Sequence, residues 1–403
     1  MKIAMVIDIY NDDGNGTSMS ARHFVEKLEE RGHQITILCQ GDKKGKEGNV
    51  YYFNAIKVPY KIQEICEKQH AILAHPDDQL IREALLDVDV VHIYLPFWLG
   101  THSSKIAKEL GKPVLGCFHI AAENITYNLG LQNVPLVDTI VYKSFKNFHY
   151  NSINNIYCPS QSIADIIREN GYTQNIYIIS NGYNPNFKQI KSIEKPDKYK
   201  DKFVIISVGR LTKEKRQDLI IKAIGNSLYK ASIVLILAGK GGLKDSYQQL
   251  AEQCNVNIEF MFINQDELIK TLNYADIFVQ ASDVETESIS CLEAIACGVV
   301  PIISNSKMCA TRQFALDSSA IFEKDDYNNL ADKIDNYISN PKRLKLLRND
   351  YARSALNYSL ENSIDSIIKV YNYIINNNGE TGKTFNYNQT ELTNMGDYIN
   401  DIN

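Results

Sequence analysis

The sequence predicts an α/β protein built from two doubly wound halves. Short apolar runs of the buried-strand kind alternate with segments of helical spacing along most of the chain. This alternation begins twice, at Lys2 and again at Phe203, on either side of a polar, lysine-rich stretch that contains Pro185 and Pro196. The chain has 403 residues, which is enough for two substantial domains.

These landmarks predict the domain organisation. We expect a first domain at 1–183 and a second at 203–359, joined by a linker at 184–202. An amphipathic helix is predicted at 363–375. The end of the chain, 377–403, is rich in Asn and Thr and is expected to be a flexible tail.

Composition and charge exclude several classes of protein. With 44% hydrophobic and 23% charged residues, the composition is that of an ordinary globular protein. Lysine and arginine number 43 against 48 aspartates and glutamates, and the parts before and after residue 190 carry 18 against 20 and 25 against 28. Neither part is basic, so nucleic acid is not an expected partner. No stretch approaches the length of a membrane-spanning helix, so any membrane contact is expected to be peripheral.

The cysteines and the N-terminus favour a cytoplasmic location. None of the eight cysteines belongs to a C-x-x-C pair, and most lie in apolar runs, as buried thiols do. Metal ligation is therefore not expected, and the pattern suits a reducing compartment. The apolar start of the chain is too short, and too soon followed by Asn11, Asp12 and Asp13, to be a signal peptide.

The first half opens with a strand at Lys2–Ile9, a loop at 10–18 with Gly14 and Gly16, and a helix at Met19–Arg31. Doubly wound folds bind ligands at this first turn, although glycines also occur in turns that bind nothing. Because the loop is longer than a tight turn needs, we interpret it as a binding loop. Further strands are predicted at Gln34–Cys39, Asp89–Tyr94, Pro113–His119, Asn155–Pro159 and Ile176–Ile179, and further helices at Thr101–Leu110, Val137–Phe148 and Ser160–Glu169.

One histidine of the first half has the position of a functional residue. His119 ends a predicted strand, and active sites form at the carboxyl ends of parallel strands, so we interpret it as catalytic. His92 and His102 lack this argument and are expected to be structural. Two nearby stretches are predicted to be irregular, an apolar loop at 95–100 and the segment at 121–131.

The second half repeats the alternation. Its strands are predicted at 203–209, Ser232–Ala238, Ile258–Phe262, Ile277–Val279 and Val299–Ile303. Its helices are predicted at Asp218–Ile224, Leu243–Cys254, Asp266–Tyr274, Ser288–Cys297, Tyr327–Ile338 and Lys342–Ala355.

Two cations follow the first strand of this half. Arg210 comes directly after Gly209 at the strand end, and Lys215 is five residues further on. Such a pair can neutralise a diphosphate leaving group, and a guanidinium binds phosphate oxygens through two hydrogen bonds. We interpret their neighbours Lys213 and Arg216 as solvated charges of the turn.

Two carboxylates, Glu285 and Glu293, lie in and after the loop that begins at Ala281. A helix N-terminus favours an anionic ligand, and carboxylates beside it can accept hydrogen bonds from sugar hydroxyls, which suggests a pocket for a phosphorylated sugar. The alternative is a capping box, in which Ser290 and Glu293 only satisfy the helix's own donors.

Taken together, these segments resemble a retaining glycosyltransferase of family 4, which has the GT-B fold. The resemblance covers 1–371, and its most specific parts are the pair Glu285 and Glu293 followed by AIACG, the strand-end GRL with Lys215, and the domain order. It implies two Rossmann-like domains that face each other across a cleft, with the C-terminal helix, 360–376, returning to the first domain.

The resemblance also implies a nucleotide-sugar donor and no metal ion or other cofactor. Arg210 and Lys215 would bind the diphosphate, and Glu293 would bind the ribose. Glu285 would bind the transferred sugar, and His119 would contact that sugar near its reacting carbon. The same correspondence places Gly16, Gly239, Ser288 and Ile289 at the donor, and Trp98, Glu123, Asn124 and Tyr127 on the acceptor side.

The sequence departs from the family pattern at two places beside the sugar. The first Glu is commonly followed by Gly-Phe-Gly, whereas Glu285 is followed by Thr286, Glu287 and Ser288. The glycine pair usual after the strand 301–304 is replaced by Asn-Ser-Lys. These changes leave the donor sugar and the base open.

The segments FHIAAENITYNLG and ATRQFALD are most similar to a bacterial branch that includes diacylglycerol glucosyltransferases. This branch implies glucose from UDP-glucose, a lipid acceptor and a peripheral position on the inner face of the cell membrane. Candidate contacts with an anionic lipid surface are Phe97, Trp98, Lys143, Phe145, Lys146 and Phe148, although the same residues also fit core and solvated faces.

Three other functions stay open on the sequence. The chain fits a glycosyltransferase for capsule or cell-wall polysaccharide with a sugar or polyprenyl-linked acceptor. It also fits a nucleotide-sugar epimerase, or a non-catalytic protein that binds nucleotide sugars.

Overall fold

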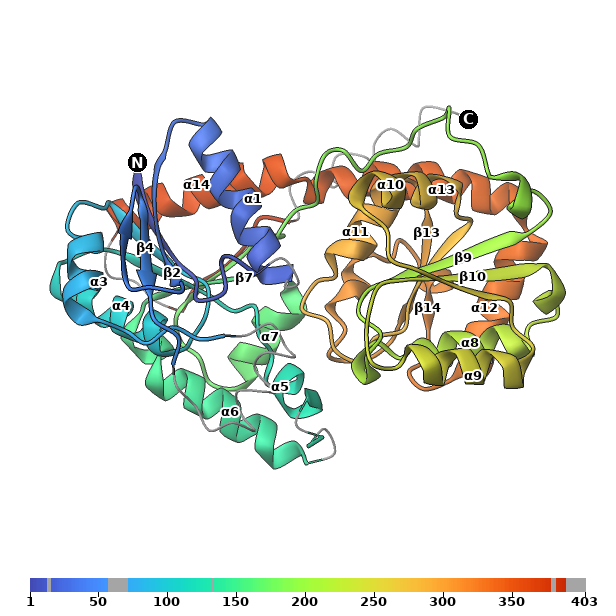
Figure 1. Ribbon diagram of the computed structural model, residues 1–403, viewed down its shortest axis with the longest axis horizontal. Helices are drawn as coiled ribbons and strands as arrows, with labels where there is room; N and C mark the ends of the chain where they lie inside the picture. Colours follow the sequence, from blue (N-terminus) through green and yellow to red (C-terminus); the bar gives the residue numbers. More distant parts are fainter. Residues whose placement is uncertain (13–15, 57–71, 129, 132–133, 378–381, 389–403) are drawn as a thin grey trace. The chain divides into compact units, whose positions relative to one another are not determined.

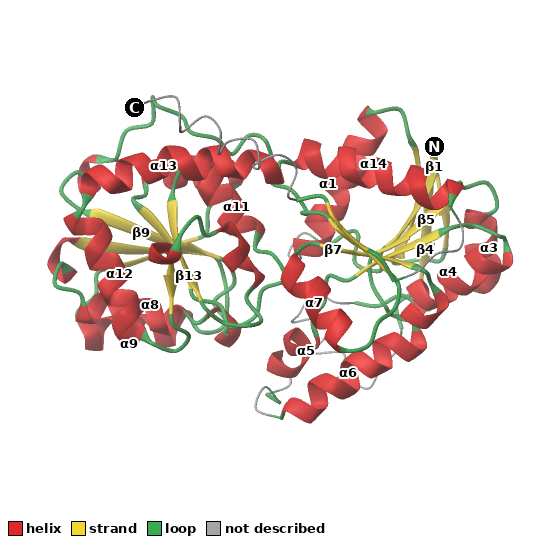
Figure 2. Cartoon of the chain, turned by 180° about the vertical axis from the view of Figure 1, so that it is seen from behind, coloured by secondary structure: helices red, strands yellow, loops and turns green. Residues whose placement is uncertain are grey.

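The computed structural model describes residues 1–12, 16–56, 72–128, 130–131, 134–377 and 382–388. The chain forms two compact units, of which one consists of Met1–Asn181 with Leu360–Asn403 and the other of Gly182–Ser359 (Figure 1). In each unit, helices lie on both faces of a mainly parallel sheet (Figure 2). The prediction of an α/β protein with two doubly wound halves is therefore confirmed.

The sheet of the first unit has nine strands within the described residues, in the order β15-β8-β7-β6-β5-β1-β2-β4-β3. Neighbouring strands are parallel, except β3 and β4. In chain order the strands are β1 (Lys2–Val6), β2 (Gln34–Gln40), β3 (Gly45–Glu47), β4 (Val50–Phe53), β5 (Val90–Ile93), β6 (Val114–Cys117), β7 (Asn155–Cys158), β8 (Asn175–Ile178) and β15 (Thr384–Asn386).

The helices of the first unit include the one that follows the second unit in the chain. They are α1 (Gly16–Glu30), α3 (Asp78–Leu85), α4 (Trp98–Glu109), α5 (Ala122–Asn128), α6 (Pro135–Phe148), α7 (Gln161–Glu169) and α14 (Leu360–Asn376). The apolar side of α14, including Ile364, Ile367 and Tyr371, is buried in the same core as α1 and β1. Arg31 of α1 forms ion pairs with Glu361 and Asp365 of α14.

Two stretches that we predicted to be irregular are helical. The helix α4 begins at Trp98, inside the expected loop 95–100, and buries Leu99. A Cβ on Gly100 would lie 2.3 Å from the carbonyl oxygen of Leu95, so this glycine lets the chain fold tightly into the helix. The segment after His119 forms α5, where Asn124 Oδ1 accepts a hydrogen bond of 3.1 Å from the backbone N–H of Ala121.

The second unit contains a six-stranded parallel sheet in the order β11-β10-β9-β12-β13-β14. Nearly all residues of its central strands are buried, as parallel sheets covered on both faces require. The strands are β9 (Phe203–Val208), β10 (Ile233–Ala238), β11 (Ile258–Met261), β12 (Ile277–Gln280), β13 (Val300–Ser304) and β14 (Ile321–Phe322). The helices are α8 (Gln217–Asn226), α9 (Lys244–Cys254), α10 (Gln265–Tyr274), α11 (Ile289–Ala296), α12 (Tyr327–Ser339) and α13 (Pro341–Ala355).

The stretch 184–202, expected to be a linker, belongs to the second unit. Tyr199 is buried there, and Lys195 donates a hydrogen bond of 2.6 Å to Asp276. The boundary between the units therefore lies directly before Gly182.

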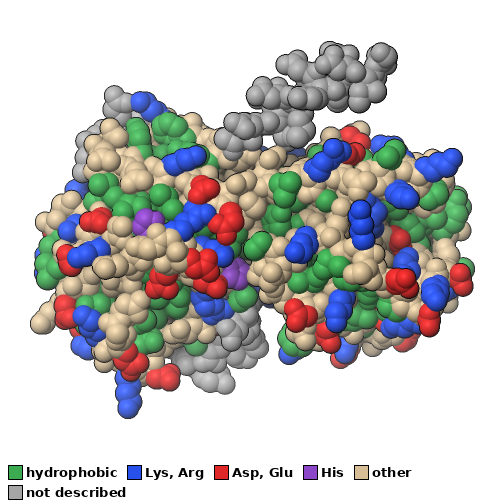
Figure 3. Space-filling view, turned by 90° about the horizontal axis from the view of Figure 1, so that it is seen from above, with side chains coloured by type: hydrophobic (Ala, Val, Ile, Leu, Met, Phe, Trp, Pro, Cys, Tyr) green, Lys and Arg blue, Asp and Glu red, His purple; other side chains and the backbone are tan. Residues whose placement is uncertain are grey.

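The surface carries charges of both signs, and most of the cysteines are buried. One face of the chain shows lysines and arginines lying among aspartates and glutamates (Figure 3). Seven cysteines are free thiols, of which all but Cys254 are buried, and Cys66 and Gly14 lie outside the described residues. In the described part of the chain, no helix combines the length and the apolar character needed to cross a membrane.

The expectation of a flexible tail from residue 377 is wrong for the described part of that segment. Residues Thr384–Asn386 form β15, which pairs with β8 at the edge of the sheet. Asn388 anchors the end of this strand, since its Oδ1 accepts a hydrogen bond of 2.7 Å from the backbone N–H of Ser180. The Phe385 ring stacks on Tyr177 with ring centroids 5.2 Å apart. The side chains of Phe385 and Asn388 therefore hold this segment through their contacts with the sheet. The strand propensity of the segment's own residues does not account for it.

We expect Phe385→Ala to lower the free energy of unfolding by about 1–2 kcal/mol, because it removes the stacking on Tyr177 and a tilted ring contact with Tyr373. Urea unfolding followed by circular dichroism measures this change. Thr384→Ser, at an exposed position of the same strand, is the matched control and should leave stability unchanged. Equal stability of Phe385→Ala and Thr384→Ser would show that β15 contributes nothing to the fold.

Candidate functional site

The predicted donor-site residues lie on loops that follow adjacent strands of the second unit. Arg210 and Lys215 follow β9, Gly239 follows β10, and Glu285 follows β12. The sheet order brings these strand ends together, because β10, β9 and β12 are neighbours and all run in the same direction. Glu293 lies on α11, the helix after the β12 loop.

Lys215 and Glu285 contact each other directly, through an ion pair between Lys215 Nζ and Glu285 Oε1. Both side chains are mostly buried, with 21% and 13% of their surface exposed. Two further donors reach the same carboxylate oxygen, Gln280 Nε2 at 2.6 Å and Ser282 Oγ at 3.2 Å. The backbone of Glu285 is also held, because its N–H donates to the carbonyl of Met308 at 2.9 Å.

A second set of contacts joins the same two loops. The backbone N–H of Asp283 donates to the carbonyl of Glu214 at 2.8 Å, and Arg216 Nη1 lies 3.1 Å from Asp283 Oδ2. Arg216 also forms ion pairs with Asp218 and Asp325. The expectation that Arg216 is a solvated charge of the turn is therefore wrong, since these carboxylates hold it between the loops.

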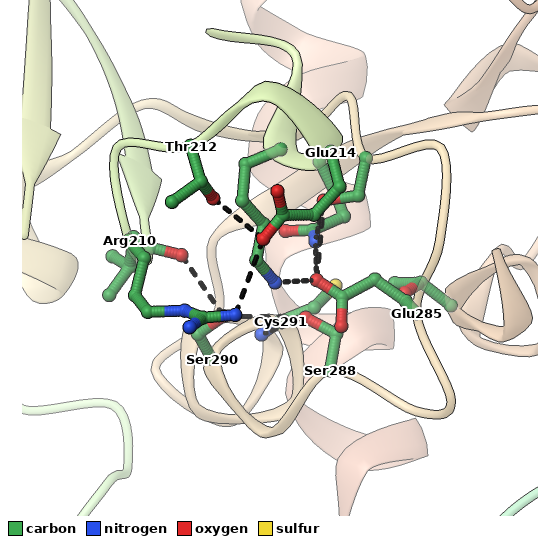
Figure 4. Close-up of polar contacts among 12 residues, drawn as sticks. Arg210, Thr212, Glu214, Glu285, Ser288, Ser290 and Cys291 are labelled. Atoms are coloured by element: carbon green, nitrogen blue, oxygen red, sulfur yellow. Dashed lines mark hydrogen bonds and ion pairs between the residues drawn. The ribbon is translucent and has the colours of Figure 1, made fainter. Parts of the chain in front are cut away.

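Arg210 is the exposed cation of the group, with 44% of its side chain exposed. Its Nη2 lies 3.3 Å from Oε1 of the buried Glu214, which also accepts a hydrogen bond of 2.7 Å from Thr212 Oγ1 (Figure 4). Gln217 binds the Arg210 carbonyl at 2.9 Å. The guanidinium is thus held near the strand end while part of it faces solvent.

Packing alone requires two glycines of these loops, Gly239 and Gly241. A Cβ on Gly239 would lie 2.0 Å from the Gly209 carbonyl oxygen, and both residues have φ near +150°. A Cβ on Gly241 would lie 2.3 Å from the Leu211 carbonyl oxygen. The loops after β9 and β10 therefore touch through their backbones, which explains these glycines without a ligand.

The N-cap of the helix α11 lies two residues earlier than the capping-box interpretation requires. Its N-cap is Ser288, whose Oγ accepts a hydrogen bond of 3.4 Å from the backbone N–H of Cys291. Ser290 and Glu293 are therefore inside the helix, and Ser290 Oγ binds the Val208 carbonyl at 3.3 Å. The capping-box interpretation of Ser290 and Glu293 is wrong, because Glu293 is too far along the helix to reach its first N–H groups.

Glu293 is mostly buried, and burial raises the pKa of its carboxyl group to about 8. A carboxylic acid that keeps its proton near neutral pH can both donate and accept a hydrogen bond. Ile289 is the first residue of the same helix, and Ser288 is its N-cap.

In the first unit, His119 lies two residues after β6, near the carboxyl end of that strand. Its ring stacks on Tyr94, with centroids 5.6 Å apart, and meets the edge of Tyr157 at 5.2 Å. Burial lowers the pKa of His119 to about 4, so the ring is neutral at physiological pH. Its Nε2 is buried and makes no hydrogen bond to another described residue. The two histidines expected to be structural have partners elsewhere: His92 contacts Tyr371 and Cys117, and His102 contacts Asp78.

The residues predicted to lie on the acceptor side differ in their exposure and in their contacts. Trp98 is exposed at the first position of α4. Glu123 accepts a hydrogen bond of 2.7 Å from Tyr142 of α6, and Asn124 binds the backbone at the start of α5, so both support local structure. Tyr127 is on the same helix, α5. Gly16 begins α1, where a Cβ would meet no described atom within 4 Å.

The sequence interpretation missed Gln280 and Ser282, which bind Glu285 from the end of β12 and the loop after it. Polar residues at the end of an otherwise apolar strand were the available signal. Within the described residues, no group of three or more histidines, cysteines or carboxylates is arranged to hold a metal ion.

Known proteins resemble this chain over most of its length. Residues 14–187 match the family described as Glycosyltransferase Family 4, and residues 188–355 match Glycosyl transferases group 1. The chain is 23% identical over 322 residues to the alpha-monoglucosyldiacylglycerol synthase of Streptococcus pneumoniae, covering 76% of this chain and 71% of that one. It is 24% identical over 311 residues to the GDP-mannose-dependent alpha-mannosyltransferase of Corynebacterium glutamicum, covering 75% and 72%. Among solved structures, Anabaena Alr3699/HepE in complex with UDP matches with a TM-score of 0.71 and 13% identity, over 92% of this chain and 100% of that one.

The raised pKa of Glu293 predicts how stability depends on pH. Between the ordinary pKa of 4.5 and about 8, the folded chain keeps a proton that the unfolded chain has lost, so this group's contribution to stability falls as pH rises. We expect the stability difference between Glu293→Gln and the wild type to grow in favour of the variant from pH 5 to pH 8, by a few kcal/mol at most. Urea unfolding at several pH values measures it, and a difference independent of pH would contradict the assignment.

Proposed function

Because the chain belongs to glycosyltransferase family 4, with the GT-B fold, it is a sugar-transferring enzyme, and we propose that it moves glucose from UDP-glucose to the hydroxyl group of diacylglycerol. The observation that carries the donor part of this proposal is the cluster of Arg210, Lys215 and Glu285 on neighbouring strand ends. Two cations beside a carboxylate suit a ligand that joins a diphosphate to a polyol.

The donor is bound by groups with separate tasks. Arg210 and Lys215 bind the diphosphate, and Glu285 accepts hydrogen bonds from hydroxyl groups of the transferred sugar. Glu293, which keeps its proton near neutral pH, both donates to and accepts from the two ribose hydroxyls. The N-terminus of α11 adds the partial positive charge of a helix start, which favours the negative phosphates.

Transfer proceeds with retention at the anomeric carbon. The bond between that carbon and the diphosphate oxygen breaks, and a bond to the acceptor oxygen forms on the same face of the sugar. The acceptor's proton passes to the departing diphosphate, so no carboxylate of the enzyme acts as nucleophile. Arg210 and Lys215 stabilise the charge that develops on the leaving group, which is where catalysis gains most. His119 is neutral and contacts the sugar as a hydrogen-bonding group, and no metal ion is required.

An exposed apolar face on α6 supports the proposal of a lipid acceptor. Leu136, Ile140 and Phe148 are exposed on this helix, together with Lys143. An apolar face with basic side chains suits the surface of an anionic membrane. One relative is a monoglucosyldiacylglycerol synthase, which agrees with this acceptor class.

Some of the residues that the sequence suggested for membrane contact have partners within the protein. Phe145 meets the edge of the Phe97 ring at a centroid distance of 6.3 Å, and Lys146 donates a hydrogen bond of 2.6 Å to the carbonyl of Gly171. These three side chains have contacts within the protein. Leu136 and Ile140, which the sequence interpretation left out, have the better position for contact with lipid.

We expect Arg210→Ala to lower turnover of UDP-glucose with diacylglycerol vesicles at least 100-fold, equivalent to about 2.7 kcal/mol, because the charge on the departing diphosphate loses a partner. Lys213→Ala removes an exposed cation from the same turn and is the matched control, with near-native turnover expected. Radiolabelled glucose in the lipid fraction measures the product, and its anomeric configuration by NMR tests retention.

Two results would contradict this assignment. Near-native turnover in Arg210→Ala would show that the guanidinium does not stabilise the departing diphosphate. Conversion of the nucleotide sugar to an epimer without an acceptor would indicate an epimerase, and nucleotide binding without any turnover across a panel of UDP- and GDP-sugars would indicate a binding protein.

We expect the wild type to co-sediment with vesicles that contain anionic phospholipid, and the double variant Leu136→Asp/Ile140→Asp to bind at least tenfold more weakly, because it replaces apolar contacts with negative charge. Leu346→Asp, at a similarly exposed leucine of α13, is the control and should bind like the wild type. A wild type that stays in the supernatant would remove the membrane from the proposal and leave the soluble transfer reaction to be judged by turnover.

A further inference from the structure

One exposed aromatic ring lies at the strand ends of the second unit, on the same edge of the sheet as the cations of the candidate site. Phe262 directly follows β11, and 70% of its surface is exposed. The ammonium group of Lys240, which follows β10, lies 3.5 Å from the centroid of the Phe262 ring. A cation over the face of an aromatic ring is attracted by the ring's electrons, so this contact orients both side chains.

The backbone fixes this pair relative to Arg210. The N–H of Gly239 donates to the Met261 carbonyl at 2.8 Å, and the N–H of Leu211 donates to the Lys240 carbonyl at 2.8 Å. The loops after β9, β10 and β11 are therefore joined to each other. Neighbouring strands lie about 4.8 Å apart, which places the ends of β9 and β11 about 10 Å from each other. Arg210, Lys240 and Phe262 thus follow one another along a single edge of the sheet.

We propose that Phe262 is a stacking platform for the base of the nucleotide donor, with Lys240 covering the opposite face of the ring. This inference rests on the proposed nucleotide-sugar donor and adds the group that holds its base. A base is planar and apolar on both faces. The cations and carboxylates that bind the diphosphate and ribose do not bind these faces, whereas an aromatic ring stacks on them. Two strand spacings are of the same order as the separation of base and diphosphate across a ribose.

The other exposed large apolar side chains described in this unit lie elsewhere. Their positions are Leu228 and Tyr229 after α8, Leu316 after a 3₁₀ turn, Leu346 on α13 and Leu356 after it. Phe262 is thus set apart because it lies on the same edge of the sheet as the phosphate-binding candidates. Because every base has an aromatic face, this platform supplies affinity for the nucleotide without choosing between bases.

Binding of three ligands tests the proposal. The wild type, Phe262→Ala and Phe262→Tyr are titrated with UDP, GDP and inorganic pyrophosphate by isothermal calorimetry. We expect Phe262→Ala to weaken the nucleotide that the wild type binds by about tenfold or more, equivalent to about 1.4 kcal/mol, and to leave pyrophosphate affinity unchanged. Phe262→Tyr keeps the ring and should restore the nucleotide affinity. Leu228→Ala, at a more exposed apolar residue, is the control and should bind like the wild type.

The outcomes separate this inference from the proposed function. If the wild type binds the nucleotide and Phe262→Ala binds it equally well, the platform is disproved and the donor assignment stands. Equal weakening of nucleotide and pyrophosphate would also disprove it, because the ring would then act on the phosphate site. A wild type that binds neither UDP nor GDP would overturn the nucleotide donor and the platform together.

Discussion

The ion pair between Lys215 and Glu285 joins the loop after β9 to the loop after β12, across a separation of 70 residues in the chain. Arg216 and Asp283 join the same loops a second time, and a backbone hydrogen bond from Asp283 to Glu214 joins them a third time. In these mostly buried surroundings opposite charges interact more strongly than in water. The strand ends are consequently held in place before a ligand arrives, and a charged group fixed in advance costs little reorganisation when the reaction develops charge.

This arrangement was only partly predictable from the sequence. A cation directly after a buried strand indicates the carboxyl edge of a parallel sheet, and the same rule applied to Glu285 places both groups on one edge. The sequence does not show that Lys215 and Glu285 contact each other, because that contact depends on β9 and β12 being neighbours in the sheet. For the same reason Arg216 was misjudged as a solvated residue. Two of its three carboxylate partners, Asp283 and Asp325, come from distant segments of the chain.

In the fold, too, some elements are predictable from the local sequence, whereas others depend on tertiary contacts. The buried strands were predictable because both faces of a parallel sheet are covered, which leaves continuous apolar runs. The hairpin of β3 and β4 has a local signal that was overlooked, since Gly48 and Asn49 separate the paired residues Glu47 and Val50. By contrast, β15 has three residues with no apolar run, and its structure depends on Tyr177 of the neighbouring strand β8 and on Ser180, which follows that strand.

Ser288 explains how the chain departs from the family pattern and still keeps the geometry of the helix start. Its backbone has φ of 79° and ψ of 82°, a left-handed conformation that glycine adopts readily and that costs other residues about 1–2 kcal/mol. The family commonly has glycine at this position. Here the serine hydroxyl accepts a hydrogen bond from the N–H of Cys291, and a cap of this kind stabilises a helix by about 1 kcal/mol, which offsets much of the strain. With serine at this position, α11 begins at Ile289 and contains Glu293. In the proposed donor site the departures after Glu285 lie beside the transferred sugar, whereas the start of the helix proposed to bind the phosphates is kept.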